Sequence, residues 1–149
     1  MDDLDLIIDL HVRNDRQGPG SDTETRRAID LARRDRGRRL AVADIGSGTG
    51  ASSLVLADAL DAHITAVDCA EPFISTLRER IDGEDLSDRI EAVVGQMEAL
   101  PFRDEQFDVI WSEGAIYNMG FKEGLRAWRR LLRPGGVIAV SEITLTTEV

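Results

Sequence analysis

Short, mostly apolar stretches alternate with longer amphipathic ones along most of the chain. Five apolar stretches predict buried strands: residues 40–43, 63–67, 90–94, 107–111 and 137–143. Three stretches between them predict helices: residues 51–60, 72–81 and 121–132. This alternation predicts β-α-β units. It therefore predicts an α/β fold with a doubly wound, mostly parallel sheet in a three-layer α-β-α domain, which binds ligands beyond the carboxyl ends of its strands.

A glycine-rich turn separates the last predicted helix from the last predicted strand. The apolar residues of that helix share one face: Leu125, Trp128, Leu131 and Leu132. We expect the Pro-Gly-Gly sequence of residues 134–136 to stop the helix, so that the fifth strand begins at Val137 and ends near Ile143.

Two more helices are predicted before the first strand. A short helix over residues 2–12 would turn these residues inward: Leu4, Ile7, Ile8 and, at the edge of the pattern, His11. The glycines and proline of residues 17–20 interrupt regular structure. Ser21 and Glu24 have the capping-box spacing, which predicts a helix from Ser21 to about Arg34 with three inward residues: Ala28, Ile29 and Leu31. We therefore separate an N-terminal helical segment, residues 1–38, from a core, residues 39–149.

Composition and charge narrow the classes of function. The 149 residues are 42% hydrophobic and 31% charged, which is ordinary for one globular domain. The formal net charge of -10 argues against nucleic acid as a partner, because phosphate binding needs a basic surface. We interpret the arginine-rich stretches 33–39 and 126–133 as solvated helix faces or ends.

Membrane insertion and metal binding are not expected either. No apolar run approaches the roughly 18 residues that cross a bilayer, and the start of the chain is acidic, unlike a signal peptide. We expect a cytoplasmic protein with no membrane partner. Cys69 is the only cysteine, which excludes an internal disulfide and a multi-cysteine metal site, and we predict no metal ligands.

A glycine-rich turn after the first strand is the strongest candidate for a ligand site. Gly46, Gly48 and Gly50 stand at alternate positions, which lets the backbone turn sharply and approach a ligand closely. Asp68 follows Gly50 by 18 residues, at the end of the second strand. An acid at about this distance is placed to accept hydrogen bonds from both hydroxyls of a ribose.

Two features distinguish this turn from a dinucleotide-binding loop. Its spacing is Gly-x-Gly-x-Gly and lacks the Gly-x-x-Gly ending that brings helix and strand together under a pyrophosphate. Asp44 precedes the turn, where its charge would repel a pyrophosphate and attract an ammonium group. The sequence thus predicts a cationic ligand.

The chain resembles the class I S-adenosylmethionine-dependent methyltransferases over about residues 40–143, and hence their Rossmann-like fold. Besides the turn, four segments carry the resemblance: residues 66–68 (Ala-Val-Asp), 95–102, 107–112 and 131–137. It implies S-adenosyl-L-methionine as cofactor, S-adenosyl-L-homocysteine as product, and these cofactor residues: Asp44, Gly46, Ser47, Gly48, Gly50, Asp68, Cys69, Gln96, Met97 and Ser112.

The resemblance also implies roles at the adenine. Gln96 stands where many relatives have an acid, and its amide oxygen would accept the adenine amino group without a charge. Met97 would offer its backbone N–H to the ring. Cys69 either lies against the adenine or ribose or is a small buried hydrophobic residue.

A small-molecule methyl acceptor is expected, and its contacts would follow the fourth strand. Glu113 and Tyr117 are the candidates for catalytic or substrate contacts, the alternatives being a turn cap and rim packing. The loop of residues 16–21 resembles a segment that folds over the cofactor in some small-molecule methyltransferases, so we expect a lid; a solvated connector is the alternative.

Two other functions stay open from the sequence: a cofactor-binding or scaffolding module without catalysis, and a NAD(P)-dependent oxidoreductase. The sequence stops soon after the fifth strand, where the resembling family continues into an antiparallel hairpin. We therefore expect an open edge at the fifth strand, and either a longer parent protein or a homo-oligomer formed through that edge.

Overall fold

The computed structural model describes residues 3–32, 36–144 and 146, without the side chain of Leu4. The predicted end of the second helix near Arg34 and the inward placement of Leu4 therefore lie outside the described residues.

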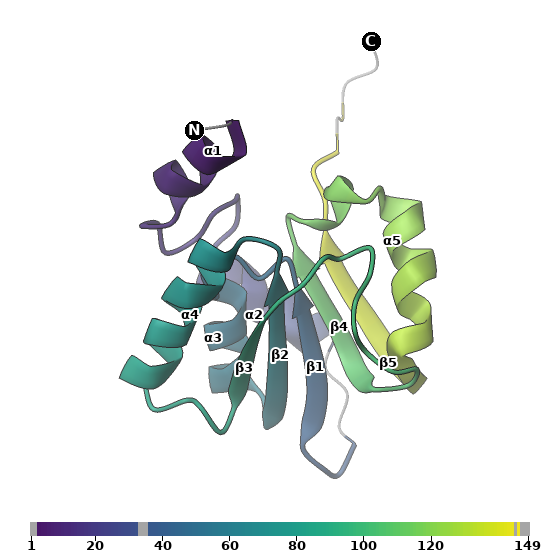
Figure 1. The fold of residues 1–149 in the computed structure, drawn as a ribbon. Helices are drawn as coiled ribbons and strands as arrows, with labels where there is room; N and C mark the ends of the chain where they lie inside the picture. Colours follow the sequence, from purple (N-terminus) through teal and green to yellow (C-terminus); the bar gives the residue numbers. More distant parts are fainter. Residues whose placement is uncertain (1–2, 33–35, 145, 147–149) are drawn as a thin grey trace.

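A five-stranded sheet forms the centre of the molecule (Figure 1). Its strands are β1 (Leu40–Ile45), β2 (Ala62–Asp68), β3 (Ile90–Val94), β4 (Phe107–Glu113) and β5 (Leu132–Ser141). Their spatial order is β3-β2-β1-β4-β5, and every neighbouring pair is parallel. The chain changes direction across the sheet between β1 and β4, which is where such sheets bind ligands. The α/β prediction is confirmed.

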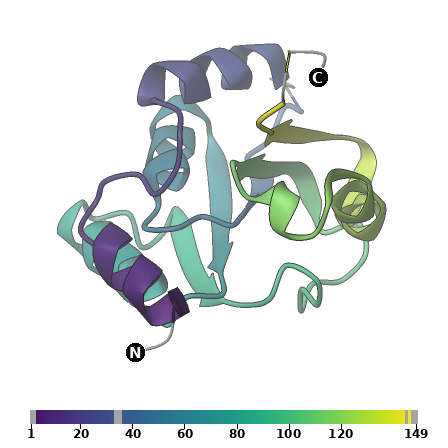
Figure 2. The same cartoon turned by 90° about the horizontal axis from the view of Figure 1, so that it is seen from above.

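Helices cover both faces of this sheet. They are α1 (Asp3–His11), α2 (Asp22–Ala32), α3 (Ala51–Ala59), α4 (Glu71–Gly83) and α5 (Phe121–Trp128), with 3-10 helices η1 (Ile116–Asn118) and η2 (Arg129–Leu131). Seen from above, α2 and α5 lie on opposite sides of the sheet (Figure 2). Within the described residues, no helix combines the length and apolar character needed to cross a membrane.

Strand alternation divides the core into two clusters. Val42 packs with residues of α2, α3 and α4 on one face, whereas Ala43 and Ile45 pack with Trp128 and Leu131 on the other. Successive side chains of a strand point to opposite faces, so position parity in β1 decides which helices a side chain meets. Asp44 shares the parity of Val42 and therefore points toward α3.

The start of α2 is as predicted, but one inward residue is wrong. Ser21 Oγ accepts the N–H of Glu24 at 3.3 Å, which confirms the cap. Ile29 is buried, whereas Leu31 is 79% exposed. Leu31 lies about 200° around the helix from Ile29, and Thr25, four residues before Ile29, occupies the inner face instead.

The last helix and strand differ from prediction at their junction. The α-helix ends at Trp128 and continues as the 3-10 turn η2, and β5 begins already at Leu132. The Pro-Gly-Gly sequence lies inside β5 as an irregularity: Phe107 pairs with Leu132 and Val109 with Val137. The strand ends at Ser141, so Ile143 falls outside it and is 74% exposed.

Candidate functional site

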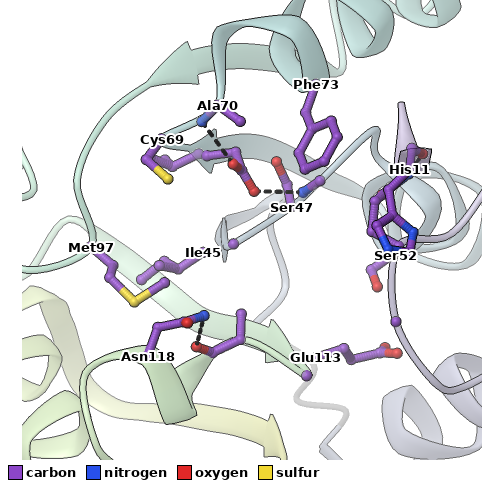
Figure 3. Close-up of a pocket in the computed structure, with 18 of the residues that line it drawn as sticks. His11, Ile45, Ser47, Ser52, Cys69, Ala70, Phe73, Met97, Glu113 and Asn118 are labelled. Atoms are coloured by element: carbon purple, nitrogen blue, oxygen red, sulfur yellow. Dashed lines mark hydrogen bonds between the residues drawn. The ribbon is translucent and has the colours of Figure 1, made fainter. Parts of the chain in front are cut away.

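A cavity of about 540 Å³ opens at the carboxyl edge of the sheet. Three parts of the chain line it: the N-terminal segment, the glycine turn after β1, and the residues that follow β2, β3 and β4. This volume lies in the range of ordinary small-molecule sites. Figure 3 shows Cys69 and Met97 together at one end of the cavity, and His11, Ser52 and Glu113 at the other.

At two positions of the turn only glycine fits, because side chains from elsewhere in the chain lie close to the backbone. Gly46 has φ +76° and Gly48 has φ +55°, a backbone region that favours glycine. A Cβ on Gly46 would collide with Ala115, and one on Gly48 with the side chain of Gln17. The N–H groups of Gly46 and Ser47 donate to the carbonyl of Val67 at 2.8 and 3.0 Å, which ties the turn to β2. Both glycines line the cavity.

Gly50 serves helix packing. It precedes α3 with φ +94°, and a Cβ there would collide with Leu77 of α4. Gly50 is not among the residues that line the cavity. Its place in the structure is therefore to let α3 pack closely against α4.

Asp68 lines the cavity beside the glycine turn. Its Oδ2 accepts the N–H of Gly48 at 2.9 Å, and its Oδ1 accepts the N–H of Ala70 at 3.0 Å (Figure 3). A carboxylate has about four acceptor positions, so each oxygen keeps one for a ligand hydroxyl. The two amides hold the carboxylate in a fixed orientation beside the turn.

Ser47 has an unsatisfied hydroxyl at the same place. Among the residues that the structure describes, its Oγ is the buried side-chain polar atom with no hydrogen-bond partner. Ser47 is 7% exposed and lines the cavity. An unpaired buried polar group costs free energy unless a ligand satisfies it. The hydroxyl of Ser47 is therefore a candidate contact for a polar ligand at this wall.

Asp44 and Ser112 lie behind the cavity wall. Asp44 is 1% exposed, and its Oδ2 accepts the hydroxyl of Ser53 at 2.6 Å. Burial, with smaller contributions from the charges of Glu113 and Asp68, raises the pKa of Asp44 to about 7. The buried hydroxyl of Ser112 donates to the carbonyl of Ile45 at 2.8 Å and so joins β4 to β1. Neither side chain is among those lining the cavity.

One end of the cavity is formed by Cys69, Gln96 and Met97. The carbonyl of Met97 accepts the indole N–H of Trp128 at 3.0 Å, which fixes the segment after β3 against α5. Desolvation and the charge of Asp68 raise the pKa of the exposed Cys69 thiol, which therefore stays uncharged at neutral pH. Gln96 is exposed.

The N-terminal segment covers the turn. The amide of Gln17 accepts the N–H of Thr49 at 2.9 Å and donates to the hydroxyl of Thr49 at 2.8 Å. Arg80 of α4 donates to the carbonyls of Asp15 and Thr49, at 3.3 and 3.2 Å. Residues of α1 and of the following loop line the cavity: Ile7, Ile8, His11, Arg16, Gln17, Gly18 and Pro19.

Glu113 is held by three donors from separate elements. Trp111 Nε1 donates to Oε1 at 2.8 Å, while Thr25 Oγ1 and Arg16 Nη1 donate to Oε2 at 3.0 and 3.2 Å. Tyr117, by contrast, is 61% exposed at the cavity mouth. Glu113 is thus a fixed carboxylate, and Tyr117 is a free side chain.

The sequence analysis missed how Arg16, Gln17, Thr25 and Arg80 fasten the N-terminal segment to the site. It singled out this loop for its resemblance to a lid segment and for its glycines. An arginine and a glutamine directly before Gly-Pro-Gly were the available signal, since polar side chains in a short loop need partners. Nothing local to Thr25 or Arg80 indicates a role here, because both partners lie far along the chain.

Comparison with known proteins gives a consistent group of relatives. Residues 42–136 match the family model described as a methyltransferase domain. Over 104 residues the chain is 36% identical to demethylmenaquinone methyltransferase of Clavibacter sepedonicus, an alignment covering 69% of this chain and 41% of that enzyme. It is 30% identical over 103 residues to 27-O-demethylrifamycin SV methyltransferase of Amycolatopsis mediterranei, covering 68% and 38%. The chain thus spans about two fifths of the length of these curated relatives.

A solved structure agrees with these matches. A proposed S-adenosyl-L-methionine-dependent methyltransferase of Methanococcus maripaludis superposes with a TM-score of 0.68 at 29% identity. The superposition covers 78% of this chain and 53% of that protein. Sequence and fold therefore indicate the same set of proteins.

Proposed function

Because the chain belongs to the class I S-adenosylmethionine-dependent methyltransferase family, we propose that it transfers a methyl group from S-adenosylmethionine to a small-molecule acceptor. The observation that carries this proposal is Asp68 held beside the glycine turn with acceptor positions free, next to the unsatisfied hydroxyl of Ser47. The two curated relatives are named for demethylmenaquinone and a demethylrifamycin, which supports a small-molecule acceptor.

The residues present fit the cofactor. Gly46 and Gly48 line the cavity and give the turn its left-handed backbone beside Asp68, which would accept the ribose hydroxyls, and Ser47 would gain a hydrogen-bond partner. We assign the adenine to the end formed by Cys69, Gln96 and Met97. Asp44, Gly50 and Ser112 would act from behind the wall, by charge and by holding the turn.

When bound, S-adenosylmethionine supplies an electrophilic methyl group on a sulfonium. The chain's own contribution is positioning and exclusion of water, because attack on this methyl spreads an existing charge and creates no new one. We propose that Tyr117 contacts the acceptor at the mouth. Glu113, with three donors already bound, would position the N-terminal lid rather than abstract a proton.

Two other functions make different predictions. A cofactor-binding or scaffolding module would share the glycine turn and Asp68, but it would release no methylated product. An NAD(P)-dependent oxidoreductase is disfavoured by the Gly-x-Gly-x-Gly spacing and by the relatives.

Calorimetric titration of the chain with S-adenosylmethionine, S-adenosylhomocysteine and NAD tests the proposal. We expect binding of the first two alone, and a loss of about 1.5 to 3 kcal/mol in Asp68→Ala from its charge-assisted hydrogen bonds. Asp61→Ala is the control, since Asp61 is exposed and pairs with Arg39. Failure to bind either sulfur compound would remove the proposal.

Catalysis needs a separate measurement. An assay for transfer of a labelled methyl group from S-adenosylmethionine to a library of quinones, polyketides and small phenols would identify the acceptor. Cofactor binding without transfer to any acceptor would favour the non-catalytic module.

Pairing of two copies through β5 also remains a prediction. β5 pairs with β4 on one side and with no other strand among the described residues. Its residues 137–140 are apolar and half-buried, the kind of edge that recruits another strand. Light scattering after size exclusion would show a dimer; a monomer at micromolar concentration would contradict it.

A further inference from the structure

The short turn η1, after β4, presents two polar side chains at the cavity. It lies between Gly114 and Gly120, whose φ values of +61° and +90° let the chain reverse on both sides of it. Ile116 is fully buried, whereas Tyr117 and Asn118 are exposed and line the cavity. One apolar side chain therefore anchors the turn in the core, and the next two stand at the cavity mouth.

The side-chain amide of Asn118 has a defined orientation. Its Nδ2 donates to the carbonyl of Ala115 at 3.0 Å, and its backbone N–H donates to the same carbonyl at 3.0 Å (Figure 3). A carbonyl oxygen can only accept, so the amide nitrogen must face Ala115 and the amide oxygen must point elsewhere. No group among the described residues donates to that oxygen. Asn118 thus brings a free hydrogen-bond acceptor to the cavity.

Ala115 ties this amide to the glycine turn. Its side chain is buried and packs so closely on Gly46 that a Cβ there would collide with it. The sheet order is β3-β2-β1-β4, so the residues after β4 lie on the far side of the turn from those after β2. With the adenine at Met97, after β3, and the ribose at Asp68, after β2, the cofactor must continue over β1 toward β4. Its methyl group then lies on the side of Asn118.

The charge of the cavity sets a second condition on the acceptor. Among the described acids, arginines and lysines, those that line it are Asp68, Glu98, Glu113 and Arg16. The cofactor, with a sulfonium, an ammonium and a carboxylate, would add one positive charge to three acids and one arginine, which leaves the loaded site negative. Arg16 already pairs with Glu113 and Asp22. An anionic acceptor would therefore be repelled and would lose hydration without a cation to replace it.

We propose that the amide oxygen of Asn118 accepts a hydrogen bond from a hydroxyl or N–H of the methyl acceptor, and that this acceptor is an uncharged molecule. The inference rests on the proposed function, because it names the acceptor chemistry of the same site. An amide oxygen is not a base, so Asn118 is a positioning residue. An analogue without the donor would leave the oxygen unpaired in the closed site, and the site discriminates against it for that reason.

The competing explanation is that Asn118 only caps η1 through Ala115. Loss of a cap would loosen the turn and weaken every acceptor alike. Loss of a specific hydrogen bond would weaken only acceptors that carry a donor. The ratio of affinities for two matched compounds therefore separates the two roles.

The test is calorimetric titration of the chain, saturated with S-adenosylhomocysteine, with phenols and naphthols and their amino, fluoro and carboxylate analogues. We expect the hydroxyl and amino forms to bind at least about tenfold more tightly than the fluoro forms, and the carboxylate forms to bind no better than the fluoro forms. Asn118→Ala should reduce the preference to less than about threefold. Asn118→Asp, which keeps oxygen acceptors, should retain it.

Gln106→Ala is the matched control. The amide of Gln106 also holds a turn, by accepting the N–H of Arg103 at 3.1 Å, but it does not line the cavity. We expect the preference for hydroxyl and amino forms to be unchanged in this variant.

Equal losses for hydroxyl and fluoro forms in Asn118→Ala would overturn the proposal and leave Asn118 as a cap. Should Asn118→Ala fail to fold, as judged by circular dichroism and thermal melting, a preference below about threefold in Asn118→Asp would overturn it. Binding of no hydroxyl or amino form, or tightest binding of a carboxylate form, would refute the acceptor class while the cofactor still binds. If S-adenosylhomocysteine itself does not bind, the proposed function fails.

Discussion

Two carboxylates are buried at opposite ends of the same sheet, and their surroundings differ. Asp108, near the start of β4, and Asp44, near the end of β1, are each 1% exposed. Asp108 accepts two hydrogen bonds from Arg38, at 2.9 and 2.7 Å, one from Arg133 at 3.0 Å and one from the N–H of Ala41 at 2.8 Å. Asp44 accepts one, from Ser53.

Their pKa values move in opposite directions. Burial alone would raise the pKa of Asp108, but the bonds from Arg38 and Ala41 and the charge of Arg133 outweigh it and hold that pKa below its usual value. For Asp44, burial dominates and raises the pKa to about 7. At the amino edge of the sheet, arginines of the protein balance the charge of Asp108, and this pairing stabilises the fold. At the carboxyl edge, the charge of ionised Asp44 has no such partner, and a cationic ligand would supply one.

Removing Asp108, the acid paired with arginines, should have the largest effect on stability. Asp108→Ala leaves Arg38, Arg133 and the N–H of Ala41 without their acceptor, but both guanidiniums are partly exposed and can be hydrated, so we expect a loss of about 2 to 4 kcal/mol in the free energy of unfolding at pH 7. Urea denaturation measures it, with Asp61→Ala, which breaks an exposed pair, as the control near zero. Because a lowered pKa stabilises only above the unfolded value, the deficit should shrink as the pH falls below about 4.

Neutralising Asp44 should change the stability in the opposite direction. Asp44 has its pKa raised from 3.8 to about 7, so the folded state binds an extra proton between these values and loses stability as the pH rises. Asp44→Asn should therefore stabilise the ligand-free chain by about 1 to 3 kcal/mol above pH 7, with the gain vanishing below about pH 4. Thermal melting across this range would show it; a destabilised variant at pH 8 would contradict the comparison.

The same variant should separate stability from binding. Ionised Asp44 favours a cationic cofactor, so affinity of the wild-type chain for S-adenosylmethionine should rise as the pH increases through 7. In Asp44→Asn that rise should be absent. A rise of the same size in Asp44→Asn would contradict this role of Asp44.

The smallest effect is expected at Ser47. Ser47→Ala removes a buried hydroxyl that has no partner, so the free energy of unfolding should change by less than about 1 kcal/mol. Cofactor affinity should fall by about 0.5 to 1.5 kcal/mol, because the hydroxyl would be satisfied by the ligand. Unchanged affinity would mean that the orphaned hydroxyl is not part of the site.

The sequence predicted much of this arrangement because local patterns determine it. The positions of the strands follow from apolar runs, and the glycine turn and Asp68 meet because parallel strands end at one edge. The placement of Asp44 was within reach as well, since its parity with Val42 directs it to α3 and away from the cavity. That inference requires following which face of the sheet each successive residue of the strand points to, in addition to the spacing of the motif.

Other features depend on distant contacts that no local pattern contains. The sequence offered Glu113 as a catalytic or substrate contact or as a turn cap, yet Thr25 and Arg16 bind it from about 90 positions earlier in the sequence. β5 starts early because Leu132 pairs with Phe107 of β4, and a Cβ on Gly136 would meet the carbonyls of Arg133 and Asp108. Leu31 is exposed because α2 packs through Thr25 and Ile29, a rotation that its own sequence leaves ambiguous.

The N-terminal wall of the cavity has one more consequence. Among the side chains that the structure describes, none of α1 or of the loop after it belongs to either hydrophobic core cluster. Polar side chains of Gln17, Arg16 and Arg80 attach this segment to the core. Changes at Ile7 or Ile8 would therefore reshape the cavity at little cost to folding. The shape of the cavity can therefore change in this part of the chain while the sheet and its core stay as they are.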